Sequence, residues 1–326
     1  MFTTNKISSG SSVIPRREFL RRSALAPFVL GYGFSLSGKL LAEFANPALE
    51  GIYKFNIGDI ECTAISDGLF HYEAHLMFAN PTKDELNSIL AQYRLDPESV
   101  PSPYTCLAVR SGNEWILIDT GIGPISPDLG KLLPRLHEAE IDPADISTVI
   151  ITHGHPDHIG GNTDEDGNVN FPNARFVMWK NEWDFWTSET ELAKLPDLFS
   201  DIARKNLPPI KDRVELLERE SEIHPGIHVI SAAGHTPGHI VVHISSGDEI
   251  LHILGDAVLH PINFEKPGWY SEFDMDPGHA VRTRRRLLER AVSEEATLQC
   301  FHFDPFPGIG NAVEYRDAWR WNAMEV

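Results

Sequence analysis

Three histidines and an aspartate crowd into one short loop, and this loop constrains the chain more than any other feature. It follows an apolar run at 149–151, which predicts a buried strand. The end of a strand is a rigid support for a loop that carries ligands. His153 and His155 are two residues apart, so in an extended segment both can point at one metal ion. Asp157 and His158 follow at a predicted turn into a helix and can point at a second ion.

Four ligands cannot complete two catalytic sites, so further ligands must come from elsewhere in the chain. Three later apolar runs each end in one strong candidate, namely His235, Asp256 and His302. Imidazole and carboxylate ligands without thiolate suit zinc, iron, cobalt or manganese, and zinc is the most usual outcome. The three cysteines have no Cys-x-x-Cys spacing, so they predict neither a thiolate site nor a disulfide framework.

From residue 51 onward, strand-like runs alternate with segments of helical periodicity. The predicted strands are rich in β-branched and aromatic residues and cover 104–109, 114–118, 148–152, 175–179, 228–231, 240–244, 249–254 and 297–301. The predicted helices cover 129–139, 180–186, 192–205 and 280–296. This alternation indicates sheets covered by helices, an α/β (α+β) fold. No linker divides residues 48–326, so we expect one domain there.

Residues 1–45 differ from the rest of the chain and look like a twin-arginine export signal. Arg16 and Arg17 precede a short apolar run at 24–36, which is too short for a transmembrane helix and suits the core of a signal peptide. We expect cleavage near 42–45 and an exported, periplasmic protein. A disordered basic tail is the competing interpretation.

The charge of the chain argues against some classes of partner. The formal net charge is −19 at pH 7, which would repel a phosphate backbone, so we expect no binding to nucleic acid. No run of about 18 apolar residues follows the N-terminal segment, so we expect no membrane attachment of the mature form. The expected partner is a small-molecule substrate.

The candidate ligands stand in an order that resembles the metallo-β-lactamase superfamily. The resemblance rests on His-x-His-x-Asp-His at 153–158, followed by His235, Asp256 and His302. Within the superfamily the chain is most similar to the methyl parathion hydrolase family and related exported lactonase- or esterase-like enzymes. The segments that carry this likeness are Leu-Ile-Asp-Thr-Gly at 117–121, Phe-Pro-Asn-Ala at 171–174, Asp-Phe-Trp at 184–186 and Phe-Pro-Gly-Ile-Gly at 306–310.

The resemblance implies an αββα four-layer sandwich with two divalent metal ions, most usually zinc, at one edge. One ion would be bound by His153, His155 and His235, and the other by Asp157, His158 and His302. Asp256 would bridge the two ions, and Asp119 would hold a ligand histidine in its orientation. Because relatives are often dimers, the resemblance also implies a homodimer.

The ligand set and the resemblance together predict a metal-dependent hydrolase. A hydroxide shared by the two ions would attack a small neutral ester or lactone, with acyl-homoserine lactones as one such substrate. Asp157 and Asp256 are the predicted catalytic carboxylates, and Asp256 could pass a proton to the leaving oxygen. Hydrolysis of organophosphate triesters is the alternative reaction. A metal-binding protein without catalysis is the alternative from another class.

Aromatic residues in two segments are candidates for an apolar substrate pocket. The loop after Asp256 offers Phe264, Trp269, Tyr270 and Phe273. The predicted helix at 180–186 offers Trp183 and Trp186, although their helical spacing makes a buried face the competing interpretation.

Overall fold

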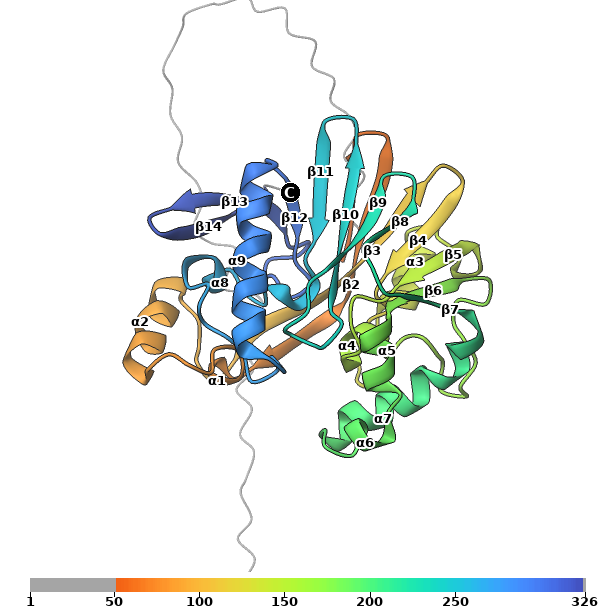
Figure 1. Ribbon diagram of the computed structural model, residues 1–326, viewed down its shortest axis with the longest axis horizontal. Helices are drawn as coiled ribbons and strands as arrows, with labels where there is room; N and C mark the ends of the chain where they lie inside the picture. The colour runs from red at the N-terminus through yellow and green to blue at the C-terminus, as the bar shows by residue number, and fades with distance from the viewer. Residues whose placement is uncertain (1–50, 325–326) are drawn as a thin grey trace, which may run out of the picture. The chain divides into compact units, whose positions relative to one another are not determined.

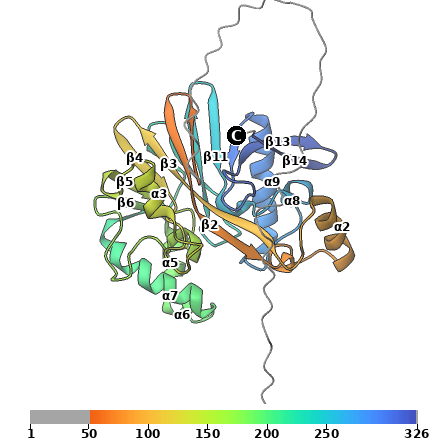
Figure 2. The same ribbon diagram turned by 180° about the vertical axis from the view of Figure 1, so that it is seen from behind.

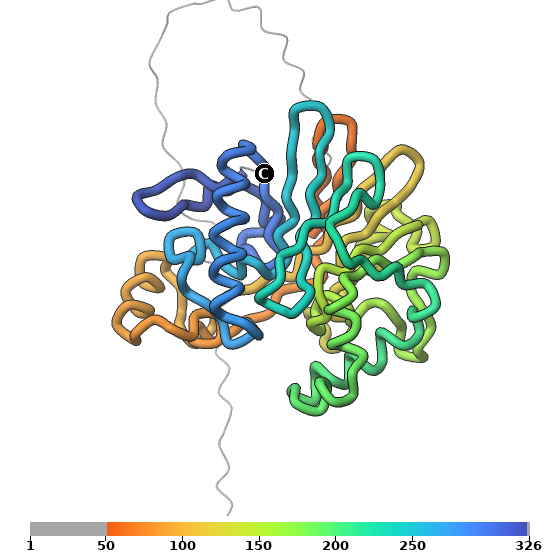
Figure 3. Tube along the Cα trace, viewed as in Figure 1, coloured from red at the N-terminus to blue at the C-terminus, as the bar shows by residue number. Residues whose placement is uncertain are grey.

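Two seven-stranded sheets and the helices around them make up the described part of the chain (Figure 1). The structure, a computed structural model, describes residues 51–324, and the predicted export signal at 1–45 lies outside them. Figure 2 shows the same elements from behind, and Figure 3 follows the chain from the first sheet into the second. The predicted α/β fold class is confirmed.

The first sheet contains the first seven strands in sequence order. Its strands are β1 (Ile52–Ile57), β2 (Ile60–Tyr72), β3 (Val100–Ser111), β4 (Glu114–Ile118), β5 (Ile146–Ile150), β6 (Arg175–Trp179) and β7 (Val214–Leu217). Strands β1 to β4 pair antiparallel, whereas β4 to β7 pair parallel. Parallel neighbours need crossover connections, and here helices supply them.

The second sheet contains the last seven strands, again as neighbours in sequence order. Its strands are β8 (Ser221–His224), β9 (Ile227–Ser231), β10 (Ile240–Ser246), β11 (Glu249–Ile253), β12 (Thr297–Gln299), β13 (Ile309–Tyr315) and β14 (Ala318–Ala323). Only β11 and β12 pair parallel, and helix α9 (Pro277–Ser293) lies in the connection between them.

Helices and turns occupy the connections between strands. The other helices are α1 (Ala74–Met77), α2 (Lys83–Tyr93), α3 (Leu132–Glu138), α4 (Pro156–Ile159), α5 (Lys180–Trp186), α6 (Glu189–Leu192), α7 (Asp197–Asn206) and α8 (Ile262–Glu265). The 3₁₀ turns are η1 (Pro143–Asp145), η2 (Pro208–Arg213) and η3 (Gly255–Ala257). Within residues 51–324, no helix is both long enough and apolar enough to cross a membrane.

Three apolar clusters hold the layers together. The central cluster joins the inner faces of the two sheets, with Ile116 and Ile150 from the first and Val229 and Val242 from the second. A second cluster lies between the first sheet and helices α3, α5 and α7. A third lies between the second sheet and helix α9. The order of layers is therefore helix, sheet, sheet, helix, as the resemblance implies.

One predicted helix is wrong in its extent. The periodicity at 192–205 predicts a single helix, but the structure has α6 ending at Leu192 and α7 beginning at Asp197. Pro196 stands directly before α7 with extended backbone at ψ 146°. A proline lacks the backbone N–H that a continuous helix would need, so the chain restarts its helix after it.

Candidate metal centre

The seven predicted ligands lie beyond the ends of strands that belong to both sheets. The loop at 153–158 follows β5 and runs into α4. His235 lies between β9 and β10, Asp256 lies in η3 after β11, and His302 follows β12. All seven side chains are buried. Four separate segments of the chain thus contribute to one centre.

The first group of donors consists of three imidazole rings and one carboxylate, from His153, His155, His235 and Asp256. His155 Nδ1 lies 3.0 Å from His153 Nε2 and 2.9 Å from His235 Nε2. Asp256 Oδ2 lies 3.3 Å from His235 Nε2 and 3.7 Å from His153 Nε2. Because one donor atom from each residue lies within 4.8 Å of the others, a single ion can contact all four.

The second group of donors consists of Asp157, His158 and His302. Asp157 Oδ2 lies 3.4 Å from His302 Nε2 and 3.9 Å from His158 Nε2. Asp256 reaches this group as well, with Oδ1 3.2 Å from His158 Nε2 and Oδ2 3.2 Å from His302 Nε2. Asp256 therefore contacts histidines of both groups, which is the position of a bridging ligand.

Asp119, at the end of β4, supports two of the ligand rings from behind. His158 Nδ1 donates to Asp119 Oδ2 at 2.7 Å. The backbone N and the hydroxyl of Thr152 donate to the same carboxylate at 2.7 and 2.8 Å. Thr152 Oγ1 then accepts from His153 Nδ1 at 3.1 Å. One carboxylate thus orients His158 directly and His153 through Thr152, in agreement with the place expected for Asp119.

Asp274 supports a third ring, and reasoning from the sequence missed it. His235 Nδ1 donates to Asp274 Oδ1 at 2.8 Å, and the backbone N of Ser271 donates to Oδ2 at 2.9 Å. The guanidinium of buried Arg284 lies 3.8 Å away. Burial acts to raise the pKa of Asp274, but His235, Arg284 and the backbone N–H of Ser271 together outweigh burial and keep the pKa below its ordinary value. A lone aspartate in a loop carries no motif that could have marked this contact.

Glu182, on α5, joins the two loops that carry the histidines of the first group, and it too was missed. Its Oε1 accepts from Gly154 N at 2.8 Å and from Trp186 Nε1 at 2.6 Å, and its Oε2 accepts from Gly238 N at 2.7 Å. The packing leaves no room for a side chain at either glycine. A Cβ on Gly154 would lie 2.3 Å from Trp186 Cδ1, and one on Gly238 would lie 2.5 Å from the backbone N of Glu182.

The donor set fits two divalent cations. The Nδ1 atoms of His153, His158, His235 and His302 all take part in hydrogen bonds behind the rings. In its neutral form, each ring therefore presents a lone pair at Nε2 toward the centre. Among the described residues, His158 Nε2 and Asp256 Oδ1 are buried without any hydrogen-bond partner. Buried lone pairs that face each other are unfavourable unless a cation or a proton lies between them.

The acid–base properties of the centre agree with this fit. Burial lowers the pKa of His153 and of His155 well below the ordinary value, so both rings are neutral at neutral pH. Burial acts in the same direction on His235, but Asp256 and Asp274 outweigh it and raise the pKa of His235 to about 9. A metal ligand must be deprotonated, so a cation bound by the first group would replace a proton on His235.

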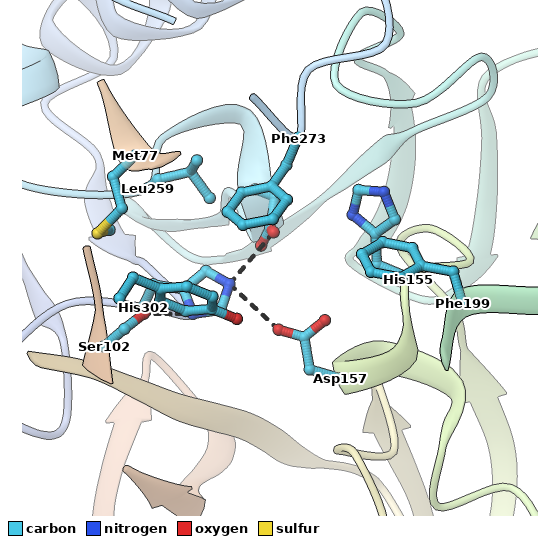
Figure 4. Close-up of a pocket in the computed structure, with 10 residues that line it drawn as sticks. Met77, Ser102, His155, Asp157, Phe199, Leu259, Phe273 and His302 are labelled. Atoms are coloured by element: carbon cyan, nitrogen blue, oxygen red, sulfur yellow. Dashed lines mark hydrogen bonds and ion pairs between the residues drawn. The ribbon is translucent and has the colours of Figure 1, made fainter. Parts of the chain in front are cut away.

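A cavity opens directly onto the ligands, and Figure 4 shows the side chains around it. Four residues of the centre line it together with mostly apolar residues and two hydroxyl side chains from other elements: Tyr72, Met77, Ser102, His155, Asp157, Phe199, Asp256, Leu259, Phe273 and His302. In Figure 4, Asp157 and His302 point toward each other, and Phe273 stands over them. Ligands of both donor groups therefore face the same cavity.

Of the aromatic residues predicted from the sequence to form a substrate pocket, only one lines this cavity. Phe273 lines it. Trp186 does not, because it is buried against His155, with ring centroids 5.5 Å apart. Trp183 packs against the same apolar cluster under the first sheet. The helical spacing of the two tryptophans indicates a buried face, and that competing interpretation is the correct one.

The other three aromatic residues also lie away from the cavity. Phe264 is buried against Phe303, with ring centroids 5.8 Å apart. Trp269 packs edge-on against Phe78 at 5.9 Å. Tyr270 is fixed through its backbone, whose carbonyl accepts from Ala79 N at 2.7 Å. These three residues thus pack against other parts of the fold, whereas Phe273 of the same loop lines the cavity.

Comparison with known proteins decides the family. The family model of the metallo-beta-lactamase superfamily matches residues 100–302. The chain belongs to the metallo-β-lactamase superfamily. An N-acyl homoserine lactonase from Bacillus thuringiensis is 26% identical over 228 residues, which cover 62% of this chain and 81% of the relative. The N-acyl homoserine lactonase AiiB from Rhizobium rhizogenes is 26% identical over 257 residues, covering 70% of this chain and 86% of the relative.

Solved structures of related hydrolases are also similar to this chain. AidC, a dizinc quorum-quenching lactonase in complex with a product, is 27% identical with a TM-score of 0.77, and the match covers 85% of this chain and 98% of AidC. The hydrolase AbOPH of the beta lactamase superfamily is 30% identical with a TM-score of 0.78 and the same coverage of 85% and 98%. The chain is therefore a metal-dependent hydrolase of this superfamily, as the sequence predicts.

Proposed function

We propose that the chain uses two divalent ions, zinc by preference, to hydrolyse small neutral lactones or esters, and that N-acyl homoserine lactones are the first class to test. The observation that carries this proposal is the meeting of the two donor groups at Asp256, on the floor of the cavity. The similarity to N-acyl homoserine lactonases supports the choice of substrate. Two bound ions would supply an acidified water as nucleophile and a positive charge for the substrate's carbonyl oxygen.

The chain's own carboxylates can move the proton that the reaction must transfer. Asp157 and Asp256 both line the cavity. Burial raises the pKa of Asp157, so its carboxylate accepts a proton more readily than an exposed aspartate does. A proton taken up at a carboxylate oxygen can then pass to the leaving alkoxide when the ring or ester bond breaks.

Tyr72 lines the same cavity and can orient the substrate. Its hydroxyl lies 2.7 Å from that of Tyr104. Tyr104 is 2% exposed, and within residues 51–324 its hydroxyl has no other hydrogen-bond partner, so Tyr104 donates to Tyr72. Tyr72 lines the cavity, which leaves its own proton free for a substrate oxygen. Burial and the charge of Asp157 raise the pKa of Tyr72, so the hydroxyl remains a donor at neutral pH.

The remaining walls of the cavity favour an apolar substituent. Met77, Phe199, Leu259 and Phe273 present only hydrocarbon, sulfur or aromatic surface to it. Such a lining stabilises an acyl chain or an aryl group by removing apolar area from water, at about 25 cal/mol per Å². No lysine or arginine lines the cavity, so nothing among its lining residues would pair with a strongly anionic substrate.

The test compares kcat/KM on three matched substrate classes after removal of metal and reloading with zinc. The panel contains N-acyl homoserine lactones of increasing chain length, an aryl ester, and a dialkyl aryl phosphotriester. We expect activity only in the reloaded protein, and higher kcat/KM for the lactones or the ester. Higher kcat/KM for the phosphotriester would establish the alternative reaction. Tight zinc binding without turnover of any substrate would overturn the enzymatic proposal in favour of a non-catalytic metal-binding protein.

A further inference from the structure

A row of polar side chains crosses the outer face of the second sheet, away from the centre described above. Cross-strand pairing places Glu222 of β8 opposite His228 of β9, His228 opposite His243 of β10, and His243 opposite His252 of β11. The ring centroids of His228 and His243 are 5.9 Å apart, and those of His243 and His252 are 4.9 Å apart. Residues next to these histidines in sequence, such as Val242, point to the core between the sheets, so the row faces α9.

Helix α9 ends beside this row and adds a carboxylate to it. Glu294, the residue that follows α9, accepts from His252 Nε2 at 2.7 Å through its Oε2. Its other oxygen, Oε1, accepts from Arg290 Nε at 2.7 Å, which fixes the orientation of the carboxylate. One donor atom from each of His243, His252 and Glu294 lies within 4.8 Å of the other two. These three residues are called the α9 cluster below.

Hydrogen bonds within the described residues do not satisfy the α9 cluster. His252 is 1% exposed, and its Nδ1 has no partner. Because its Nε2 donates to Glu294, this Nδ1 is an unprotonated acceptor that meets no donor. His243 Nδ1 is also buried and without a partner. Two ring nitrogens of one three-residue cluster are thus buried without a hydrogen-bond partner, which is unfavourable.

The charge state of the α9 cluster suits a cation. Burial and the neighbouring His252 lower the pKa of His243 to about 4, and burial also lowers the pKa of His252. Both rings are therefore neutral at neutral pH and carry the lone pairs that metal ligation needs. A hollow of about 390 Å³, lined in part by His228, His243 and Arg290, opens onto the cluster at His243.

We propose that the α9 cluster is a second metal site, in which His243, His252 and Glu294 bind one divalent cation of the zinc class. The cation would replace the proton that lies between His252 Nε2 and Glu294 Oε2. Two imidazoles and one carboxylate are ligands that zinc, cobalt or nickel accept and that magnesium and calcium do not favour. The site shares no residue with the two donor groups of the candidate centre. Its ion would tie the end of α9 to the sheet, and α9 also carries Arg284, which lies beside Asp274.

The experiment measures the metal content and the ring-nitrogen signals of the full chain. Protein stripped with a chelator is reloaded with Zn²⁺ alone, freed of excess metal, and assayed by mass spectrometry. We expect Glu294→Gln, and separately the double variant His243→Gln/His252→Gln, to hold one zinc ion fewer per chain than the unsubstituted protein. His228→Gln is the matched control, since His228 lies in the same row but outside the cluster, and it should keep the full content. The kcat/KM of the zinc-loaded variants should stay within about twofold.

Ring ¹⁵N spectra of the unsubstituted chain give an answer that does not depend on how well a variant folds. We expect zinc to shift the imidazole nitrogen signals of both His243 and His252, each identified by its absence in the matching variant. Equal zinc content in all variants would overturn the proposal, as would unshifted signals from these two rings. Ordered water bound at the two Nδ1 atoms would produce this negative result.

Discussion

The replacement of Asp274 by asparagine tests most directly how the centre is built. The aspartate accepts two hydrogen bonds, from His235 Nδ1 at 2.8 Å and from the backbone N of Ser271 at 2.9 Å. Asparagine has the same shape but only one acceptor oxygen, because the other position becomes an NH₂ donor. Whichever way the amide turns, one of the two contacts places a donor against a donor. If Ser271 keeps the oxygen, His235 loses the partner that holds its ring.

The size of the effect follows from these contacts. Loss of the partner behind a metal-ligating histidine lowers metal affinity or activity by about 10- to 100-fold. At about 1.36 kcal/mol for each factor of ten, this is about 1.4–2.7 kcal/mol. The free energy of unfolding should also fall, by about 1–3 kcal/mol, because a buried donor is left unpaired. Buried Arg284 loses its carboxylate neighbour at the same time.

The assay determines zinc affinity by competition with a chelator, alongside kcat/KM and thermal unfolding. Asp276→Asn is the matched control, because Asp276 is exposed and caps α9 by accepting from His279 N at 2.9 Å. Asparagine caps a helix about as well as aspartate, so the control should keep its zinc affinity and its stability. If Asp274→Asn binds zinc as tightly as this control does, the contact with His235 does not position the ligand, and the reasoning is refuted.

Three further changes test other parts of the account. Tyr72→Phe should lower kcat by about 100-fold with little change in KM, because it removes a donor to the substrate oxygen. Tyr53→Phe, which lies away from the cavity, should keep its kcat, and equal kcat in the two variants would contradict the proposed role. Glu182→Gln should lower the free energy of unfolding by about 1–3 kcal/mol in chemical denaturation, because one of its three donors loses its acceptor. Replacing Arg16 and Arg17 together by lysine should leave the protein in the cytoplasm on cell fractionation, whereas unchanged export would rule out a twin-arginine signal.

The sequence predicts the candidate ligands well because the information about them is local. Residues 153–158 lie in one loop. His235, Asp256 and His302 each come shortly after an apolar run that forms a strand. Where strands of two facing sheets end at one edge, the side chains that follow them meet. The structure brings all seven residues together, and their role as ligands stays a prediction.

The walls of the cavity could not be predicted in this way. Tyr72 and Met77 come from the end of β2 and from α1, neither of which the sequence patterns indicate. Strand β2 is buried over much of its length and exposed at its far end, so it shows no simple alternation of apolar and polar residues. Of the six aromatic residues suggested in their place, only Phe273 lines the cavity, and Trp186 and Phe264 are buried in the core. Helical spacing of tryptophans indicates an inward-facing side of a helix as readily as it indicates a pocket.

The contacts behind the ligands explain why the residues of the centre can be predicted and its geometry cannot. A ligand histidine can be identified from its position in the sequence alone. The orientation of its ring depends on a hydrogen-bond partner from a distant segment. Asp119 follows β4, Asp274 precedes α9, and Glu182 lies in α5. All three carboxylates are buried, and each is held by backbone N–H groups as well as by side chains. A buried carboxylate is stable only when the whole tertiary structure supplies these donors, so the orientation of the ligands and the stability of the fold depend on the same contacts. Substitutions at these carboxylates should therefore lower both the metal affinity and the free energy of unfolding. A substitution that removes only a ligand should lower the metal affinity and have a smaller effect on the stability of the metal-free chain.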